Sequence, residues 1–365
     1  MKKIMVTFGT RPEAIKMGPV IKAIQNDPNF QLVICVTGQH KEMLEQVLKI
    51  FKINPHYDLK IMKKNQTLFD VTTEILNGIK PILEMERPDI VLVHGDTSTT
   101  FAVALACFYL NVKVGHVEAG LRTFDMWSPF PEEFNRQCVT KVANLHFAPT
   151  LQAKNNLLDE KINEDKIFVT GNTAIDALKY TVHPEYSSEL IEWIGDSKLI
   201  LLTAHRRENL GTPMENIFKA VNQILLNHSN VKIIYPIHLN PRIRKLADDI
   251  IVKSDNVRIV EPLDVVTFHN LMAHSYLILT DSGGIQEEAP SLGKPVLVLR
   301  DTTERPEGID AGTLKLIGTK TEDIIDSVNK LLSSQEEYNR MAKAVNPYGD
   351  GCAADRIIEI LRHEK

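Results

Sequence analysis

The sequence contains few aromatic residues, no closely spaced cysteines and no excess of positive charge. Aromatic residues make up 6% of its 365 residues, and the formal net charge at pH 7 is −5. An acidic chain of this kind is not expected to bind nucleic acid through a general basic surface. The four cysteines lie far apart and form no Cys-x-x-Cys pair, which is typical of reduced thiols in a cytoplasmic protein.

Long apolar runs and a dinucleotide-binding fingerprint are missing as well. No apolar run approaches the length of a membrane span and the N-terminus shows no cleavage site, so we expect a cytoplasmic protein without membrane contact. No Gly-x-Gly-x-x-Gly follows a predicted strand, which argues against a bound nicotinamide cofactor. His116 and Glu118 have no evident third partner, so we predict no metal site.

Short runs of Ile, Val and Leu alternate with longer amphipathic segments. Such runs are typical of parallel strands that are covered on both faces. The predicted strands are Ile4–Phe8, Leu32–Thr37, Ile90–His94, Val112–Val117, Ile167–Thr170, Leu199–Thr203, Val231–Pro236, Val257–Val260, Tyr276–Thr280 and Pro295–Leu299. Predicted helices between them include Ala14–Gln25 and Thr99–Leu110. Repeated β–α units of this kind predict an α/β fold with doubly wound parallel sheets.

The pattern starts afresh near Lys198, which predicts two such domains around a central cleft. We expect an N-terminal domain over residues 1–171 and a C-terminal domain over residues 172–346. Residues 347–365 contain a helix that we expect to return to the first domain. Ligands of open α/β sheets bind beyond the carboxyl ends of the strands, and most polar clusters of this sequence fall there.

The segment Thr280–Glu288 is the most informative of these clusters, since it predicts a strand, a glycine turn and the start of a helix. Gly283 and Gly284 would let the backbone approach a ligand closely and adopt a positive φ. The helix start would attract an anion, and Glu288 would reach a ribose diol. A tight turn before a solvated acidic helix is the alternative.

Carboxylates and cations gather at the strand ends of the first domain. Arg11 and Lys16 stand at a helix entrance, where two cations are favourable if an anion lies between them. Asp96 is either a helix cap or a catalytic carboxylate. Glu118 is expected to face the cleft, since it ends another predicted strand.

Glu132 and Arg136 share one face of a predicted helix that follows a proline-rich loop. They form either a surface ion pair at the helix start, or the loop fixed by two prolines presents Glu132 as a positioned acid or base. In the second domain, His205 ends a strand beside two arginines, and its imidazole titrates near neutral pH when unperturbed. Arg305 is either a phosphate or sugar contact or part of a surface loop.

Taken together, these segments resemble the non-hydrolysing UDP-N-acetylglucosamine 2-epimerase family nearly end to end. The matching motifs are FGTRPEAIKM, VHGDTSTT, VGHVEAGLRT, SPFPEEFNR, TAHRREN, TDSGGIQEEAPSLGKPV, LRDTTERPEG and NPYGDG. The resemblance implies a GT-B fold of two Rossmann-like domains and interconversion of UDP-GlcNAc and UDP-ManNAc, which supplies ManNAc for bacterial surface polysaccharide. It also implies a homodimer.

The resemblance also assigns residues to parts of the substrate. It places Asp96, Glu118, Glu132 and Lys16 around the sugar, and Arg11 and His205 at the diphosphate, with His205 also among the catalytic residues. The remaining substrate contacts that we expect are Arg136, Phe268, Ser282, Gly283, Gly284, Glu288 and Arg305. Gln39 and His40 match a second, activating nucleotide-sugar site of some members, in which Glu42 and Asn65 replace a Gln and an Arg.

The chemistry favours elimination over oxidation at a neighbouring carbon. Departure of UDP from C1 makes the C2 hydrogen acidic, a carboxylate removes it, and 2-acetamidoglucal and UDP form. Protonation on the opposite face and re-addition of UDP then give the epimer, with no cofactor. The alternatives are a hydrolysing epimerase that releases ManNAc and UDP, a GT-B glycosyltransferase, and a regulator that only binds the nucleotide sugar.

Overall fold

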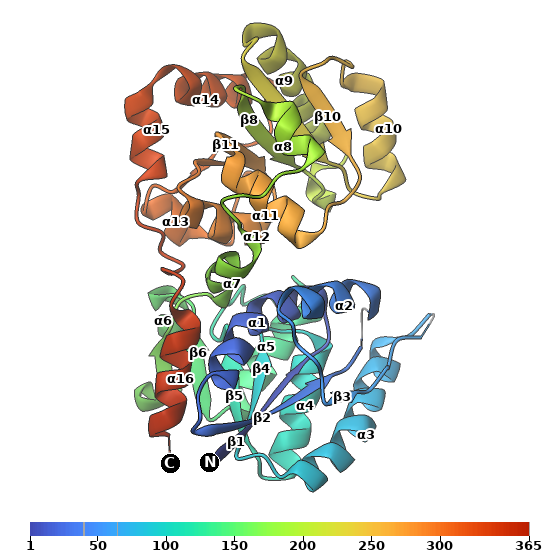
Figure 1. Ribbon diagram of the computed structural model, residues 1–365, viewed down its shortest axis with the longest axis vertical. Coiled ribbons are helices and arrows are strands. Elements are labelled where there is room, and N and C mark those ends of the chain that lie inside the picture. The colour runs from blue at the N-terminus through green and yellow to red at the C-terminus, as the bar shows by residue number, and fades with distance from the viewer. Residues whose placement is uncertain (39–40, 64, 365) are drawn as a thin grey trace. The chain divides into compact units, whose positions relative to one another are not determined.

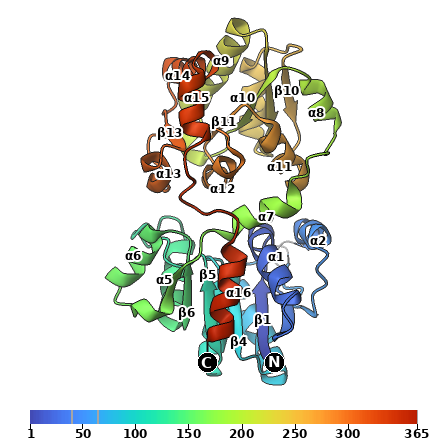
Figure 2. The same cartoon turned by 60° about the vertical axis from the view of Figure 1, so that its left-hand side comes forward.

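The computed structural model describes residues 1–38, 41–63 and 65–364. It divides into two compact units, one formed by Met1–Tyr180 with Tyr348–Lys365 and the other by Thr181–Pro347. Each unit is a parallel sheet with helices on both faces (Figures 1 and 2). No helix in the described part of the chain is long and apolar enough to cross a membrane.

The first unit contains a seven-stranded parallel sheet in the order β3-β2-β1-β4-β5-β6-β7. Its strands are β1 (Lys2–Phe8), β2 (Phe30–Val36), β3 (Tyr57–Asp58), β4 (Ile90–His94), β5 (Lys113–Val117), β6 (Leu145–Ala148) and β7 (Ile167–Val169). Its helices are α1 (Arg11–Gln25), α2 (Lys41–Ile50), α3 (Leu68–Glu86), α4 (Ser98–Tyr109), α5 (Glu132–Val142), α6 (Leu151–Asp159), α7 (Thr173–Thr181) and α16 (Ala353–His363), with a 3-10 turn η1 (Glu164–Lys166).

The second unit contains a six-stranded parallel sheet in the order β10-β9-β8-β11-β12-β13. Its strands are β8 (Lys198–Thr203), β9 (Val231–Pro236), β10 (Val257–Val260), β11 (Leu277–Thr280), β12 (Val296–Val298) and β13 (Leu314–Leu316). Its helices are α8 (Glu189–Ile194), α9 (Thr212–Asn227), α10 (Pro241–Ile250), α11 (Val265–His274), α12 (Gly283–Glu288), α13 (Pro306–Asp310), α14 (Thr321–Ser333) and α15 (Gln335–Ala342), with 3-10 turns η2 (Arg207–Asn209) and η3 (Ala289–Leu292).

Every predicted strand coincides with an observed one to within two residues at either end. The sequence prediction missed β3, β6 and β13. These strands are two, four and three residues long, so their apolar runs are too short to stand out from the helical segments beside them.

The first unit extends to Tyr180, whereas the sequence placed its end at residue 171. The reason is α7, whose Ala177 is buried in the first unit's core. Asp176 of α7 also accepts hydrogen bonds from the backbone N–H groups of Ala353 (3.2 Å) and Ala354 (2.8 Å), which begin α16. The C-terminal helix therefore belongs to the first unit, and the second crossing lies at Pro347–Tyr348.

Candidate active site

Strand order locates one candidate half-site in each unit. In the first sheet β1 lies between β2 and β4, and in the second sheet β8 lies between β9 and β11. The connections after β1 and β4 therefore leave in opposite directions, as do those after β8 and β11, and ligands of doubly wound sheets bind at this switch point. Most of the predicted site residues follow these strands or a neighbouring one, and Phe268 follows β10 at the edge of the second sheet.

The turn after β1 is held by a buried glutamate that the sequence prediction did not single out. Glu13 accepts hydrogen bonds from the backbone N–H groups of Gly9 (3.0 Å) and Thr10 (2.8 Å), and from the hydroxyl of Thr97 (2.8 Å). Burial raises the pKa of the Glu13 carboxyl, while these hydrogen bonds lower it. The signal in the sequence was the capping box that Thr10 and Glu13 form at the start of α1. This network joins the turn after β1 to the turn after β4.

Lys16 forms an ion pair with Glu118, so the anion beside this cation is supplied by the protein itself. Arg11 is the first residue of α1 and is half-buried. The expectation of an anionic ligand between Arg11 and Lys16 stays a prediction. Lys16 thus places its positive charge beside Glu118, the carboxylate that follows β5.

Glu118 has a backbone conformation that residues with side chains rarely adopt, with φ of 63°. Its side chain, only 9% exposed, binds Lys16, accepts a hydrogen bond from Asn172 Nδ2 (3.1 Å) and lies 3.6 Å from His94 Nε2. Burial lowers the pKa of His94 to about 4, so this imidazole is neutral at pH 7. A left-handed glutamate held by several partners is typical of a functional position.

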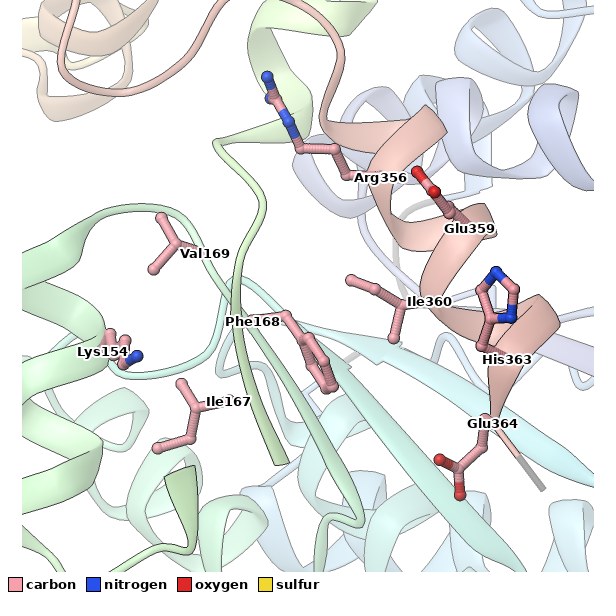
Figure 3. Close-up of a pocket in the computed structure, with 9 residues that line it drawn as sticks. All are labelled: Lys154, Ile167, Phe168, Val169, Arg356, Glu359, Ile360, His363 and Glu364. Atoms are coloured by element: carbon pink, nitrogen blue, oxygen red, sulfur yellow. The ribbon is translucent and has the colours of Figure 1, made fainter. Parts of the chain in front are cut away.

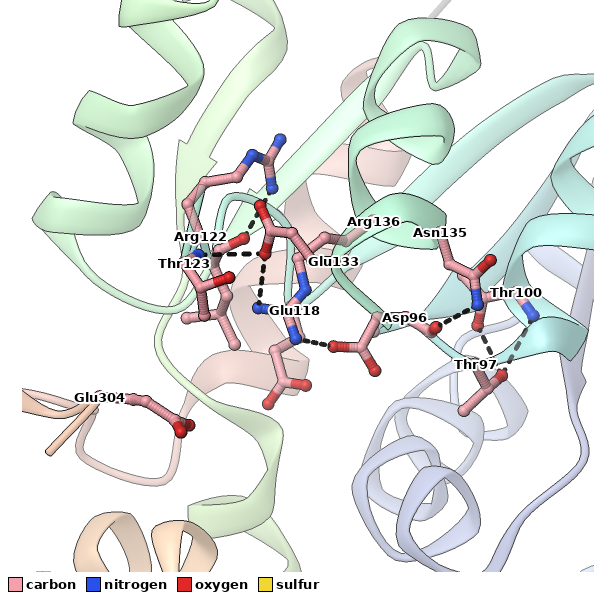
Figure 4. Close-up of polar contacts among 12 residues, drawn as sticks. Asp96, Thr97, Thr100, Glu118, Arg122, Thr123, Glu133, Asn135, Arg136 and Glu304 are labelled. Atoms are coloured by element: carbon pink, nitrogen blue, oxygen red, sulfur yellow. Dashed lines mark hydrogen bonds and ion pairs between the residues drawn. The ribbon is translucent and has the colours of Figure 1, made fainter. Parts of the chain in front are cut away.

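Asp96 is not the cap of α4, because Thr97 takes that position and its hydroxyl accepts from the backbone N–H of Thr100 (3.2 Å). Asp96 instead forms an ion pair with Arg136 of α5 (Figure 4). Its backbone carbonyl accepts from Asn135 Nδ2 (2.9 Å). Burial raises the pKa of the Asp96 carboxyl, and the charge of Arg136 offsets part of this rise. A buried carboxyl with a shifted pKa is a candidate functional group.

The predicted pairing of Glu132 with Arg136 is not observed, since Arg136 binds Asp96 and lies 3.6 Å from Glu133. Glu132 is half-buried at the start of α5, and its charge raises the pKa of Asp96. Glu133, which the sequence prediction passed over, is fully buried and accepts from the backbone N–H groups of Thr123 (3.0 Å) and Phe124 (3.2 Å) (Figure 4). Glu133 thus fixes the start of the loop that precedes α5 through these two hydrogen bonds. Glu132 takes no part in them.

The glycine turn of the second unit is open above its backbone. Neither Gly283 nor Gly284 has a positive φ, so that part of the prediction is wrong. A Cβ added at Gly283 would lie in ordinary contact with Arg305 Nη2 (3.5 Å) and Arg206 Nη2 (3.6 Å), and one at Gly284 would meet only Glu288 Oε1 (4.0 Å). The protein itself does not require glycine here, which favours the prediction of a ligand on the backbone.

Two guanidinium groups converge on this turn, which is the arrangement expected for a diphosphate. Arg305, half-buried and paired with Glu287, is part of the turn rather than of a free surface loop. Arg206 was noted in the sequence only as a neighbour of His205. Ser282 is the N-cap of α12, and its side chain makes no capping hydrogen bond.

Glu288 and Phe268 lie on α12 and α11, the helices beside this turn. Glu288 Oε2 lies 3.5 Å from Nε2 of the buried His269, whose Nδ1 is 2.7 Å from the hydroxyl of Thr181. Phe268 precedes His269 on α11 and is half-buried. The structure therefore places the Glu288 carboxylate on the helix that begins at the glycine turn, and the assignment of Phe268 to the ligand stays a prediction.

His205 follows β8 and stacks on His238, with ring centroids 5.6 Å apart and planes inclined by 10°. Burial lowers the pKa of its imidazole, and the nearby Asp281 raises it. Gln39 and His40 lie outside the described residues, so their assignment to a second nucleotide-sugar site stays a prediction.

A groove of about 670 Å³ between β7 and α16 contains none of the predicted site residues (Figure 3). It is lined by Lys154, Ile167, Phe168, Val169, Arg356, Glu359, Ile360, His363 and Glu364. Among the described residues, no group of three or more His, Cys, Asp or Glu side chains could hold a metal ion.

Two doubly wound parallel sheets, with carboxylates at one switch point and arginines over a glycine turn at the other, define a protein of the GT-B fold. The fold is shared with a glycosyltransferase from Rickettsia africae, at a TM-score of 0.63 and 15% identity. The UDP-N-acetylglucosamine 2-epimerase family model matches residues 22–362, and the chain belongs to this family.

Individual relatives match the chain over nearly their whole length. The chain is 57% identical to the UDP-N-acetylglucosamine 2-epimerase of Bacillus subtilis, covering 98% of this chain and 94% of that protein. A crystal structure from Listeria monocytogenes superposes with a TM-score of 0.95 at 54% identity, covering 99% and 96% of the two chains. A Neisseria meningitidis enzyme bound to UDP-GlcNAc has a TM-score of 0.89 at 49% identity, covering 99% and 100%.

Proposed function

We propose that this chain interconverts UDP-GlcNAc and UDP-ManNAc by eliminating UDP and adding it back. The observation that carries the proposal is the pair of half-sites: a carboxylate cluster after β4 and β5, and two arginines over an open glycine turn after β11. The Neisseria meningitidis relative, 49% identical, binds UDP-GlcNAc. A protein that only bound the nucleotide sugar would need the second half-site alone.

The first half-site supports a division of the proton transfers. Glu118, held beside Lys16, is the group we assign to removal of the C2 proton as the C1–O bond breaks and UDP leaves with the bonding electrons. Asp96, whose pKa is raised by burial, is assigned to protonation of C2 in the glycal from the opposite face. Glu132 lies close enough to affect Asp96 electrostatically and is assigned to exchange of its proton.

The second half-site supports retention of UDP. Arg206 and Arg305 would neutralise the diphosphate as charge develops on the leaving oxygen, and Glu288 would bind the ribose. Departure of UDP from C1 makes the C2 hydrogen acidic. The proposed reaction therefore uses neither a nicotinamide nor a metal. Retained UDP distinguishes this reaction from hydrolysis, in which water captures the intermediate.

One incubation separates this proposal from its alternatives. UDP-GlcNAc is incubated with the protein in heavy water without an acceptor, and products and C2 label are followed by NMR. UDP-ManNAc that carries deuterium at C2 supports the proposal. Free ManNAc would identify a hydrolysing epimerase, and unlabelled, unchanged substrate would identify a transferase or a binding protein.

We further propose a homodimer in the cytoplasm that supplies ManNAc for surface polysaccharide. Large apolar side chains are exposed on α3 and α4, namely Phe69, Met85, Phe108 and Tyr109. Exposed apolar side chains of this kind can contribute to an interface between two copies of the chain. All four cysteines are free thiols, as expected in a reducing compartment. Light scattering tests the dimer, and a mass of 41.2 kDa at micromolar concentration would contradict it.

A further inference from the structure

A buried carboxylate that the sequence prediction did not assign lies directly behind His205. Asp281 follows β11 and has no exposed surface. Its Oδ2 accepts three hydrogen bonds, from the backbone N–H groups of His205 (2.8 Å) and Arg206 (2.9 Å) and from Asn209 Nδ2 (3.0 Å). Three donors fix the orientation of the carboxylate and leave its second oxygen aimed elsewhere.

The second oxygen, Oδ1, lies 3.5 Å from His205 Nδ1. It is buried and makes no hydrogen bond among the residues that the structure describes. A buried carboxylate oxygen without a donor is costly, and a small rotation of the imidazole would satisfy it. The side chain of His205 is 40% exposed, so the ring has one edge toward Asp281 and another toward solvent.

Two further contacts surround His205 and Asp281. His238 stacks on one face of the imidazole at 5.6 Å. Arg206 donates from Nε to the backbone carbonyl of Asp281 (3.3 Å), and its Nη2 reaches the space above Gly283. The imidazole of His205, the carboxylate of Asp281 and the glycine turn are thus connected through Arg206 at the ends of β8 and β11.

We propose that Asp281 is a positioning residue for His205, which it holds with Nδ1–H toward Oδ1 so that Nε2 faces the leaving diphosphate. The proposal rests on the proposed function, because it takes the ligand of His205 to be the diphosphate of a nucleotide sugar. With that ligand bound, the ring is protonated on both nitrogens and lies between two anions. As the C1–O bond breaks, Nε2–H donates to the diphosphate oxygen that gains the electron pair. Re-addition of UDP reverses this step, so no proton is consumed.

The substitution Asp281→Asn tests the orientation directly. The side-chain oxygen of Asn must occupy the position of Oδ2, because three donors converge there, and the NH₂ group then faces His205 Nδ1. A donor at that place forces Nδ1 to become an acceptor and moves the proton of the neutral ring to Nε2. We expect kcat to fall about a hundredfold, while the dissociation constant of UDP changes less than about threefold.

The tautomer itself is the decisive measurement, made by ¹⁵N NMR of the imidazole without substrate. Wild type should show Nδ1 protonated in the neutral ring, and Asp281→Asn should show Nε2 protonated. Asn209→Ala is the matched control, since it removes one donor from Oδ2 without facing His205. It should lower the melting temperature and leave the tautomer and kcat close to wild type.

Several outcomes would overturn the proposal. A wild-type His205 with its proton on Nε2 would do so even if Asp281→Asn fails to fold. An unchanged tautomer in Asp281→Asn, or an equal loss of kcat in Asn209→Ala, would show that Asp281 acts only in folding. Because the tautomer is read without turnover, absence of epimerase activity in wild type would contradict the proposed function separately.

Discussion

At the scale of single residues, Gly9 and Gly284 differ in what an added side chain would meet. A Cβ at Gly9 would lie 2.1 Å from Thr37 Oγ1 and 2.4 Å from Thr99 Oγ1, so both side chains would have to move. A Cβ at Gly284 has space on the protein side. The first glycine is therefore required for folding, and we attribute the second to the ligand.

The variant Gly284→Ala should bind UDP at least about tenfold more weakly, because the new methyl group occupies the space that the phosphates need. Its unfolding free energy should change by less than about 0.5 kcal/mol, since no protein atom is displaced. Calorimetric titration with UDP and thermal unfolding measure the two quantities. Gly9→Ala is the contrasting variant, expected to unfold at a clearly lower temperature. Wild-type UDP affinity in Gly284→Ala would refute the assignment of this turn to phosphate.

Glu118→Gln should abolish most C2 exchange, by a factor on the order of 10² to 10⁴, because the amide cannot remove a proton. UDP affinity should stay near the wild-type value, since the nucleotide contacts that we assign lie in the other unit. Deuterium uptake at C2 and titration with UDP measure these effects.

Glu164→Gln is the control for this variant. Glu164 belongs to the same unit and pairs with Lys154, but its side chain is 67% exposed. The variant Glu164→Gln should catalyse C2 hydrogen exchange at the wild-type rate. Equal exchange in Glu118→Gln and Glu164→Gln would remove Glu118 from the proton transfer.

At the scale of elements, β4, β5 and β6 each carry a buried histidine. Burial lowers the pKa of His94 to about 4, of His116 to about 3 and of His146 to about 4. A depressed histidine pKa means that the unfolded chain binds more protons than the folded one between these values and about 6.5. The folded state should therefore lose stability as the pH falls from about 6.5 toward 4.

The expected slope is about 1.4 kcal/mol per pH unit for each of these histidines near pH 5.5. His146→Gln should reduce proton uptake on unfolding by about one proton, which calorimetry in buffers of different ionisation enthalpy measures. Between pH 7.5 and 8.5 wild type and variant should show the same slope, which serves as an internal control. An unchanged uptake at pH 5.5 would mean that His146 is protonated in the folded protein.

At the scale of the whole molecule, the first unit is completed by the C-terminus of the chain. Helix α16 packs on α1, and Ile357 and Leu361 are buried in the same core as Ile4 and Phe8 of β1. The second unit is thus an insertion between α7 and α16 in the sequence. The first unit cannot reach its full core until the last residues have been synthesised.

Ile357→Ala should destabilise the first unit by about 2 to 5 kcal/mol, because it leaves a cavity in a core that spans both ends of the chain. Thermal unfolding measures the effect. Glu359→Ala on the exposed side of α16 is the control, and its change should stay within about 0.5 kcal/mol. UDP affinity should be retained in Ile357→Ala at temperatures where the protein is folded. Equal melting temperatures of the two variants would show that α16 is not part of the core.

The local sequence predicted the positions of most strands and placed the candidate site residues after them. Continuous runs such as Ile90–His94 and Val231–Pro236 became strands with the bounds that their composition indicated. Polar residues after these runs fall at the carboxyl ends of a parallel sheet, because every strand of a doubly wound sheet points the same way. This is why Asp96 and His205 could be singled out from one sequence as candidate site residues, and their roles stay predictions.

What the sequence determined by itself is the order of the elements and which residues end them; which partner each side chain takes was decided only by the tertiary structure. Arg136 binds Asp96 rather than Glu132, Glu118 turns left-handed, and Asp281 lies behind His205. Such pairings depend on strand order and on residues far apart in the chain, which local periodicity does not encode. Burial, which sets the pKa of Asp96 and His94, arises only when the layers pack together.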